Sequence, residues 1–198
     1  MPVQQVRNRV SPARLRSIAR RLLNASTLCA IATVSADGRG HINTAYFAWS
    51  ATFEIVWLSA PEARHSRNIR RRPAVAIAVY DSTQKWGGFD RGVQLFGTAH
   101  QVAGRAVPEA DRLYRRRFKA PASDELRAYR LYRFQPKTLK LFHERELGGG
   151  TFVTATVGRD GGLAWVRTER YVTGADLGRA GAAGAMSSAA LDMVRPMT

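Results

Sequence analysis

Three neighbouring stretches of the chain decide its fold: HINTAYFAWS (41–50), IVWLSAPEARHSRNIRRRPAVAIAVYDS (55–82) and RGVQLFGTAHQV (91–102). Each contains a strand-length run rich in β-branched, aromatic or other apolar residues. Short turns join the first two runs, and strands joined in this way pair antiparallel. A short helix over 62–71, which ends before Pro73, interrupts the strands. The centre of the chain therefore predicts an antiparallel meander.

The flanking segments extend this pattern. Residues 28–34 are an apolar run that precedes an Asp37-Gly38 hairpin signal, and residues 12–23 show helical spacing after the N-cap Ser11. Gly97, inside the expected strand 93–102, predicts a bulge or a barrel corner. The further expected elements are strands over 53–59, 74–80, 136–143, 152–157 and 163–167, and helices over 108–118 and 123–131.

About six antiparallel strands with a few short helices predict a mainly β fold closed into a small barrel. A parallel doubly wound sheet would alternate strands with longer helices, and no GxGxxG motif follows a strand. We expect one domain over residues 1–173 and a flexible Ala/Gly-rich tail over 174–198.

Composition narrows the class of protein. Hydrophobic residues make up 45% of the 198, which is enough to bury a core. No apolar run approaches the roughly 18 residues of a membrane span, and no secretory signal is recognisable at the N-terminus. The single cysteine, Cys29, cannot form an internal disulfide, and no Cys/His cluster has the spacing of metal ligands. We expect a soluble cytoplasmic protein without a metal site.

The net charge of +16 is concentrated in residues 1–23, 62–72 and 105–119. Such a charge suggests an anionic partner, nucleic acid among them. All three segments are also predicted helices, so we favour solvated helix faces, and a basic nucleic-acid-binding module remains the alternative. The sequence has no GxSxG, HExxH or P-loop motif, and its four histidines are scattered. Nothing in it indicates a hydrolase.

The order of these elements resembles the pyridoxamine 5′-phosphate oxidase-like family of FMN-binding split barrels. The resemblance covers roughly residues 14–143: the first helix, the Asp-Gly hairpin, the strand rich in aromatic residues, the Arg-rich turn into a short helix, the segment Asn68-Ile69-x-x-x-Pro73-x-Val75, and the strand GVQLFGTA (92–99). It implies a six-stranded antiparallel split β-barrel with flanking short helices. It also implies a homodimer with FMN at the subunit interface, so that the second chain completes each site.

The residues suit the two ends of FMN. Arg64, His65 and Ser66 occupy the first turns of the helix after the third strand, where donor side chains and the helix dipole favour a phosphate. For the ring, the family's contacts come from the second and third strands, and Gln94 is a further polar candidate. On this chain those strand positions are Asn43, Thr44, Ala45, Leu58 and Ser59.

The resemblance implies an FMN-dependent oxidoreductase that acts on a small organic substrate by hydride transfer at flavin N5. Trp86, in the loop 81–91, is a candidate to cover the ring, with local packing as its alternative role. For Trp57, a place in the ring site and a place in the core are equally compatible with the sequence.

Two departures from the family pattern limit this expectation. The best-studied oxidases have an arginine at the position of Asn43 and Ser-Arg-Lys at Ala63-Arg64-His65, so Ser66 and Arg67 would have to compensate. The C-terminal residues that bind the substrate phosphate in the vitamin B6 enzyme have no counterpart, and we do not predict pyridoxamine phosphate oxidation. Split barrels that bind haem or a deazaflavin, or that are not enzymes, are the alternatives, with His41 or His65 as the haem ligand.

Overall fold

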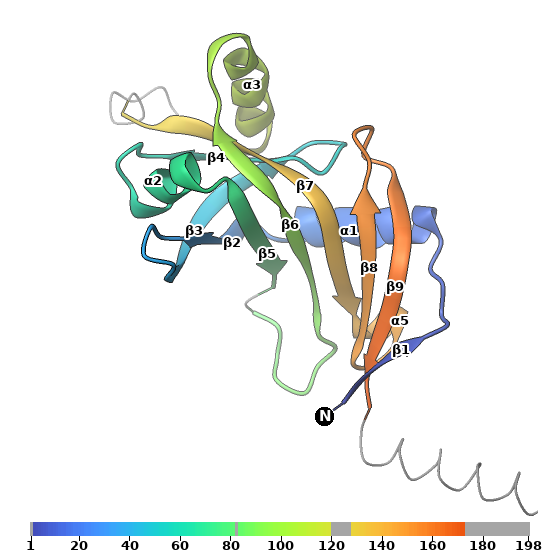
Figure 1. Cartoon of the computed structure of the whole chain (residues 1–198). Coiled ribbons are helices and arrows are strands. Elements are labelled where there is room, and N and C mark those ends of the chain that lie inside the picture. Colours follow the sequence, from blue (N-terminus) through green and yellow to red (C-terminus); the bar gives the residue numbers. More distant parts are fainter. Residues whose placement is uncertain (1, 82, 120–127, 173–198) are drawn as a thin grey trace, which may run out of the picture.

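The computed structural model describes residues 2–81, 83–119 and 128–172 (Figure 1). Its strands are β1 (Val3–Val6), β2 (Leu28–Val34), β3 (Gly40–Trp49), β4 (Ile55–Ser59), β5 (Ala74–Tyr80), β6 (Arg91–Gln101), β7 (Arg130–His143), β8 (Thr151–Val157) and β9 (Leu163–Tyr171). Its helices are α1 (Pro12–Ala25), α2 (Arg64–Arg71), α3 (Val107–Arg117) and α5 (Glu144–Leu147), with a 3-10 turn at Gly104–Ala106. None of the helices in these ranges is long and apolar enough to cross a membrane.

Six of the strands close into a barrel. Their order is β7-β4-β3-β2-β5-β6, and β6 pairs with β7 again to complete the ring, with every pair antiparallel. The predicted mainly β, six-stranded antiparallel barrel with short flanking helices is confirmed. Strand β7 is long enough to leave the ring, and its second half pairs with β8, from which β9 and β1 continue the sheet.

The closing pair contains the bulge that the sequence predicted. The register of β6 and β7 shifts between Phe96 and Gly97. A Cβ atom on Gly97 would lie 2.0 Å from the Gln135 carbonyl oxygen, so only glycine allows the two backbones to approach this closely. Pro136 lies directly opposite Gly97, in the middle of β7. We expected the strand to begin at Pro136, whereas a proline at a bulge is compatible with a continuous strand.

Several elements differ from the sequence prediction. The helix expected over 123–131 is wrong at its end, because Arg130 and Leu131 begin β7, and residues 120–127 lie outside the described ranges. The third strand begins at Ile55, because Phe53 adopts a positive φ of 65° in the preceding turn while its side chain is buried. β1 was not predicted, since its sequence VQQV has no strong apolar pattern. The expected tail over 174–198 also lies outside the described residues.

The barrel interior is filled by aliphatic and aromatic side chains. Trp57 is fully buried and stacks on Tyr132 with the ring centroids 5.6 Å apart, so its role is in the core. Helix α1 crosses behind the sheet (Figure 1) and buries Leu15, Ile18 and Leu23 in the same core. Burial raises the pKa of the Cys29 thiol to about 12, which keeps this cysteine neutral and unreactive. Helix α3 packs on the outside of β3, β4 and β7 over a second, smaller core.

Candidate functional site

The outer face of the barrel carries a shallow trough whose floor is made of alanines. From β3 to β6, one row across the sheet consists of Thr44, Ala30, Ala78 and Gln94. The next row in the same direction consists of Ile42, Ala32, Ala76 and Phe96. Both rows face the same side, because residues two positions apart on a strand point the same way. Four methyl groups therefore form a flat floor between taller side chains on β3 and β6.

The trough encloses about 260 Å³ and is lined by these alanines together with Ile42, Gln94 and Phe96. Its sides are apolar, and the Gln94 side chain is the polar group at the β6 edge. Such a shape, flat and apolar with a hydrogen-bonding group at one edge, suits a planar ring system.

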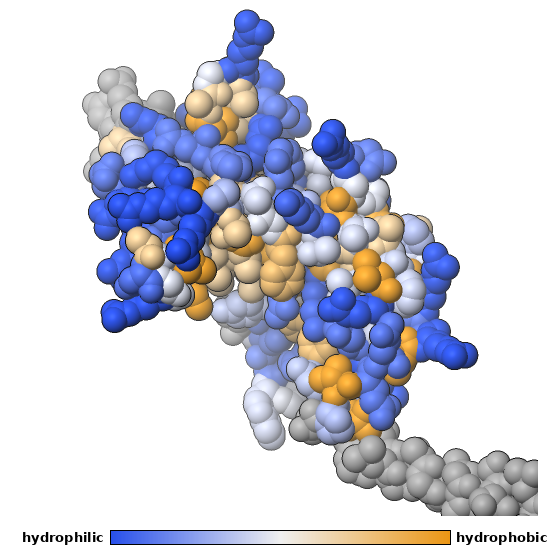
Figure 2. Space-filling model, in the orientation of Figure 1, coloured by the Kyte–Doolittle hydropathy of each residue, from blue (hydrophilic) through white to orange (hydrophobic). Residues whose placement is uncertain are grey.

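An apolar surface surrounds the trough. Ile42 is 70% exposed and Tyr46 57%, and Leu28, Tyr80 and Phe96 are also exposed on the same four strands. Figure 2 shows part of this surface as a pale to orange strip over β5 and β6, next to a strongly hydrophilic region over α2. A contiguous exposed apolar patch of this kind is typical of a surface that binds a ligand or a partner protein.

Beneath α2 lies a buried hydrogen-bonded cluster. The hydroxyl of Ser59, at the end of β4, lies 2.7 Å from Nε2 of His65 and accepts a hydrogen bond from Ser66 Oγ at 3.2 Å. All three residues are buried. Burial lowers the pKa of His65, and the charge of nearby His41 lowers it further. The imidazole is therefore neutral near pH 7 and fixes the start of α2 on the barrel.

A second polar contact joins α2 to the hairpin between β2 and β3. The Asn68 side-chain amide donates to Thr33 Oγ1 at 3.0 Å and to Ser35 Oγ at 3.4 Å. Both Asn68 and Thr33 are buried. This contact sets the distance between the helix and the hairpin, and it leaves a pocket between them.

That pocket, which we call the α2 pocket, is basic. It encloses about 390 Å³ between α2 and the hairpin residues Ser35–Gly40. The arginines in its lining are Arg39 from the hairpin and Arg64, Arg67 and Arg71 from one face of α2. The one acidic residue in the lining, Asp37, forms an ion pair with Arg39, with Nε 3.5 Å from the carboxylate. The lining therefore contains three further arginines and no further carboxylate to balance their charge.

The start of α2 adds backbone donors beside this pocket. Its N-cap is Ala63, which has no side-chain oxygen to cap the helix, and the first intrahelical bond runs from Arg67 N to the Ala63 carbonyl at 3.0 Å. The backbone N–H groups in the first turn of a helix have no hydrogen-bond partner within the helix. They are therefore free to donate to a bound anion.

The structure places the residues that the sequence singled out in five locations. Thr44 and Gln94 lie on one row across the sheet, and Gln94 lines the trough. Ser59, His65 and Ser66 form the buried cluster, and Arg64 lines the α2 pocket. Asn43 and Ala45 alternate with Thr44 along β3, so they face the opposite side of the sheet, where their partners on β2 are the buried Ile31 and Cys29. Leu58 packs against the α3 core.

Trp86 does not pack against any part of the chain that the structure describes. Its side chain is fully exposed at the tip of the loop between β5 and β6, so the alternative of local packing is wrong. Sequence reasoning missed the alanine floor and Arg39. The only signal for the floor is that alanines alternate with larger apolar residues along β2 and β5. Within the described ranges, no group of three or more His, Cys, Asp and Glu side chains is placed to hold a metal ion.

A family model described as pyridoxamine 5′-phosphate oxidase matches residues 16–143. This match covers well over half of the chain and spans most of α1 and the whole barrel. The chain belongs to the pyridoxamine 5′-phosphate oxidase family. Strands β8, β9 and β1, which extend the sheet beyond the barrel, lie outside the matched range. No significant match was found among curated protein sequences.

Solved structures share the fold of this family member at low sequence identity. A putative pyridoxamine 5′-phosphate oxidase from Listeria innocua is 16% identical with a TM-score of 0.52, over 64% of this chain and 97% of the other. The haem storage protein HutZ from Vibrio cholerae is 22% identical with a TM-score of 0.52, over 59% and 86%. A haem-binding protein from Mycobacterium smegmatis is 13% identical with a TM-score of 0.52, over 87% and 95%.

Proposed function

We propose that this protein is an FMN-dependent oxidoreductase that acts on a small organic substrate. The observation that carries the proposal is the pairing of a flat, alanine-floored trough with a basic pocket at one end of it. Ala32 on the floor is three residues from Ser35 in the lining of the α2 pocket, which corresponds to about 10 Å along a strand. A flat ring joined to a phosphate by a short flexible chain has these dimensions.

The phosphate end is assigned to the α2 pocket. Arg64 and Arg67 supply guanidinium donors, and the uncapped start of α2 supplies backbone N–H groups and the positive end of the helix dipole. Here His65 and Ser66, which the sequence suggested as direct phosphate ligands, have a different task. Their side chains are bonded to Ser59 beneath the helix, so they orient the start of α2 and contribute to the phosphate site through it.

The ring end is assigned to the trough. The alanine methyl groups allow a planar ring to lie against the sheet, and the Gln94 amide and the Thr44 hydroxyl flank it with hydrogen-bonding groups. When bound, FMN supplies hydride transfer at N5. The chain itself supplies orientation and a dry surface, and no acid or base among its side chains is required.

We also propose that a second copy of the chain covers the trough. The exposed apolar residues around it, Ile42, Tyr46 and Tyr80 among them, are the kind of surface that a homodimer buries. Trp86, exposed beyond the Tyr80 end of β5, is available to cover the ring. Sedimentation of the purified protein at twice the chain mass of 21.9 kDa is the expected result.

An absorption spectrum of the purified protein, followed by heat release of any chromophore and titration with FMN, tests the function. We expect flavin bands or saturable FMN binding, and FMN binding at least about tenfold weaker in the double variant R64Q/R67Q. The charge-matched variant R7Q/R105Q removes two exposed arginines outside the site and should bind as wild type does. A colourless protein that does not bind added FMN would overturn the proposal.

Haem is the second candidate, because two of the similar structures are of a haem storage and a haem-binding protein. His41, which is partly exposed, would be the ligand, whereas His65 is buried with Nε2 committed to Ser59. A Soret band that appears on haem addition and is lost in His41→Ala would support haem over flavin.

A further inference from the structure

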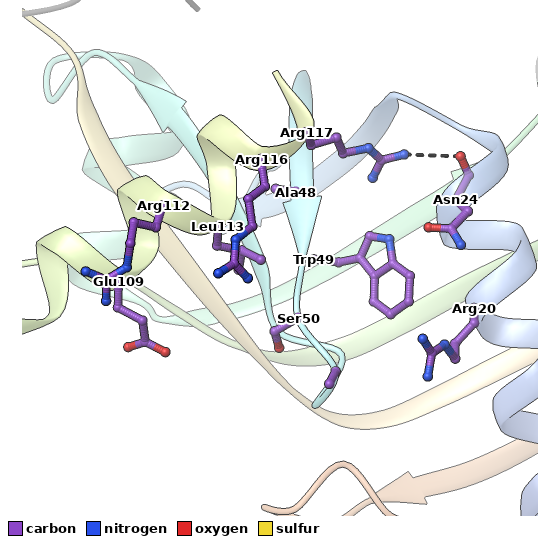
Figure 3. A pocket seen from close by; sticks show the side chains of 11 residues that line it. Arg20, Asn24, Ala48, Trp49, Ser50, Glu109, Arg112, Leu113, Arg116 and Arg117 are labelled. Atoms are coloured by element: carbon purple, nitrogen blue, oxygen red, sulfur yellow. Dashed lines mark hydrogen bonds between the residues drawn. The ribbon is translucent and has the colours of Figure 1, made fainter. Parts of the chain in front are cut away.

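A second basic pocket, the α3 pocket, lies at the opposite end of β3 from α2 (Figure 3). It encloses about 640 Å³ between α1, the end of β3 with its turn, and α3. The charged residues in its lining are Arg20 from α1 and Glu109, Arg112, Arg116 and Arg117 from α3. None of these belongs to the trough or to the α2 pocket, so the α3 pocket is separate from the proposed flavin site.

One of the arginines has a structural task. Arg117 donates hydrogen bonds to the carbonyl oxygens of Leu23 at 2.9 Å and Phe47 at 3.1 Å, and also to those of Asn24 and Ser26. Its guanidinium also lies 4.6 Å from the centroid of the Phe47 ring. These bonds satisfy carbonyls at the end of α1 and join α1 to α3. Arg117 therefore builds the wall of the pocket and has little donor capacity left for a ligand.

Arg112 and Arg116 have no such partners. Within the part of the chain that the structure describes, neither guanidinium makes a hydrogen bond or an ion pair. The two residues are four apart on α3 and lie on the same face, where like charges destabilise a helix. Arg20 faces them across the pocket, with its guanidinium 5.8 Å from the Trp49 ring centroid, and Figure 3 shows Arg116 and Arg20 on either side of Trp49.

The floor of the pocket is rigid. The Trp49 ring stacks on Phe53 at 6.1 Å with an interplanar angle of 12°, which holds the indole in place below the arginines. At one edge the Glu109 carboxylate accepts a hydrogen bond from Arg133 at 3.1 Å, which leaves Arg112 and Arg116 without a hydrogen bond to it. Three cations, Arg20, Arg112 and Arg116, therefore line an open pocket in which Glu109 is the one acidic residue of the lining.

We propose that the α3 pocket binds a compact phosphorylated ligand, with its phosphate groups held by Arg112, Arg116 and Arg20. The volume is typical of a small-molecule site, and the pocket is walled on three sides. A nucleic-acid backbone would instead need a basic stripe that continues past the pocket. The Glu109 carboxylate at the edge opposes such an extended polyanion.

Calorimetric titration of the full chain with pyrophosphate tests the proposal, because two linked phosphates can contact arginines on opposite walls. The titrations use the R64Q/R67Q background, which removes cations of the α2 pocket. Addition of R112Q/R116Q should weaken pyrophosphate binding by at least about tenfold, since each charge-assisted hydrogen bond to phosphate is strong. Addition of R7Q/R105Q instead removes the same charge elsewhere and should change the affinity by less than about twofold.

Equal pyrophosphate affinity in the R112Q/R116Q and R7Q/R105Q backgrounds would overturn the proposal. So would a protein that ignores pyrophosphate but binds duplex DNA with a steep salt dependence that R112Q/R116Q removes. Circular dichroism checks the fold of each variant, and the single change Arg116→Gln, with its own loss of affinity, serves if the combined variant does not fold.

Discussion

The two basic pockets at the ends of β3 differ in the side chains that hold their helices in place. Under the α2 pocket, neutral side chains hold the helix: Ser59, His65 and Ser66 bond one another out of contact with solvent. Beside the α3 pocket, a charged side chain holds the helix: Arg117, at the end of α3, donates hydrogen bonds to backbone carbonyls of α1 and β3. The arginines of a basic sequence therefore fall into two kinds: those that hold the structure together and those proposed to bind a ligand. The hydrogen bonds that each arginine makes within the protein distinguish the two kinds.

The largest expected effect is on stability, from Arg117→Ala. This change leaves several carbonyls without a donor and removes the contact with Phe47, so the free energy of unfolding should fall by about 3 kcal/mol. Arg116→Ala, one residue away and without a hydrogen bond to any described residue, should change it by less than about 0.5 kcal/mol. Urea denaturation of the two variants makes the comparison, and equal losses would show that Arg117 is not the structural member.

Ala78→Leu should affect ligand binding and leave the fold intact. The larger side chain fills the trough floor, so FMN affinity should fall by about 100-fold or more, while the outward-facing position keeps the core unchanged. Ala164→Leu, at an exposed site on β9, is the matched control. Fluorescence titration measures both, and unchanged FMN binding by Ala78→Leu would place the ring elsewhere.

Ser59→Ala probes the foundation of the α2 pocket. Its hydroxyl serves both His65 and Ser66, so removing it should leave buried groups without partners and cost about 2 kcal/mol of unfolding free energy. Ser66→Ala breaks one of these bonds and should cost less. If the order of the two losses is reversed, the cluster is not centred on Ser59.

The smallest expected effect is on the pH dependence of stability. Because the pKa of His65 lies below 6.5 in the folded chain, the unfolded chain binds this proton first as the pH falls. His65 therefore destabilises the fold progressively from about pH 6.5 down to its lowered pKa, with a slope of at most about 1.4 kcal/mol per pH unit. His65→Gln should remove this part of the slope, whereas His100→Gln, at an exposed site on β6, should not.

The fold could be predicted from the sequence because its signals are local. The runs 28–34 and 74–80 are strands with those bounds, and Gly97 lies at the bulge of the closing pair. Errors arose where a local signal was ambiguous. Pro136 looked like the start of a strand and lies inside one, and Phe53 looked like a strand residue and turns the chain.

The site could be predicted only in part, because it depends on register. Asn43, Thr44 and Ala45 cannot all face the same site, since neighbouring residues on a strand point to opposite faces of the sheet. The alanine floor comes from two separate strands. No sequence motif links Ala30 with Ala78, and only the pairing register of β2 and β5 places them side by side. The α3 pocket likewise has Arg20 and Arg112 in one lining, although most of the barrel sequence separates them along the chain.

The affinity of the protein for FMN relative to riboflavin tests the central claim most directly, because the two ligands differ only in the phosphate. We predict that wild type and R112Q/R116Q bind FMN at least about tenfold more tightly than riboflavin, and that R64Q/R67Q loses this preference while it still binds riboflavin. A preference for FMN that survives R64Q/R67Q, or that disappears in R112Q/R116Q instead, would contradict the assignment of the phosphate to the α2 pocket.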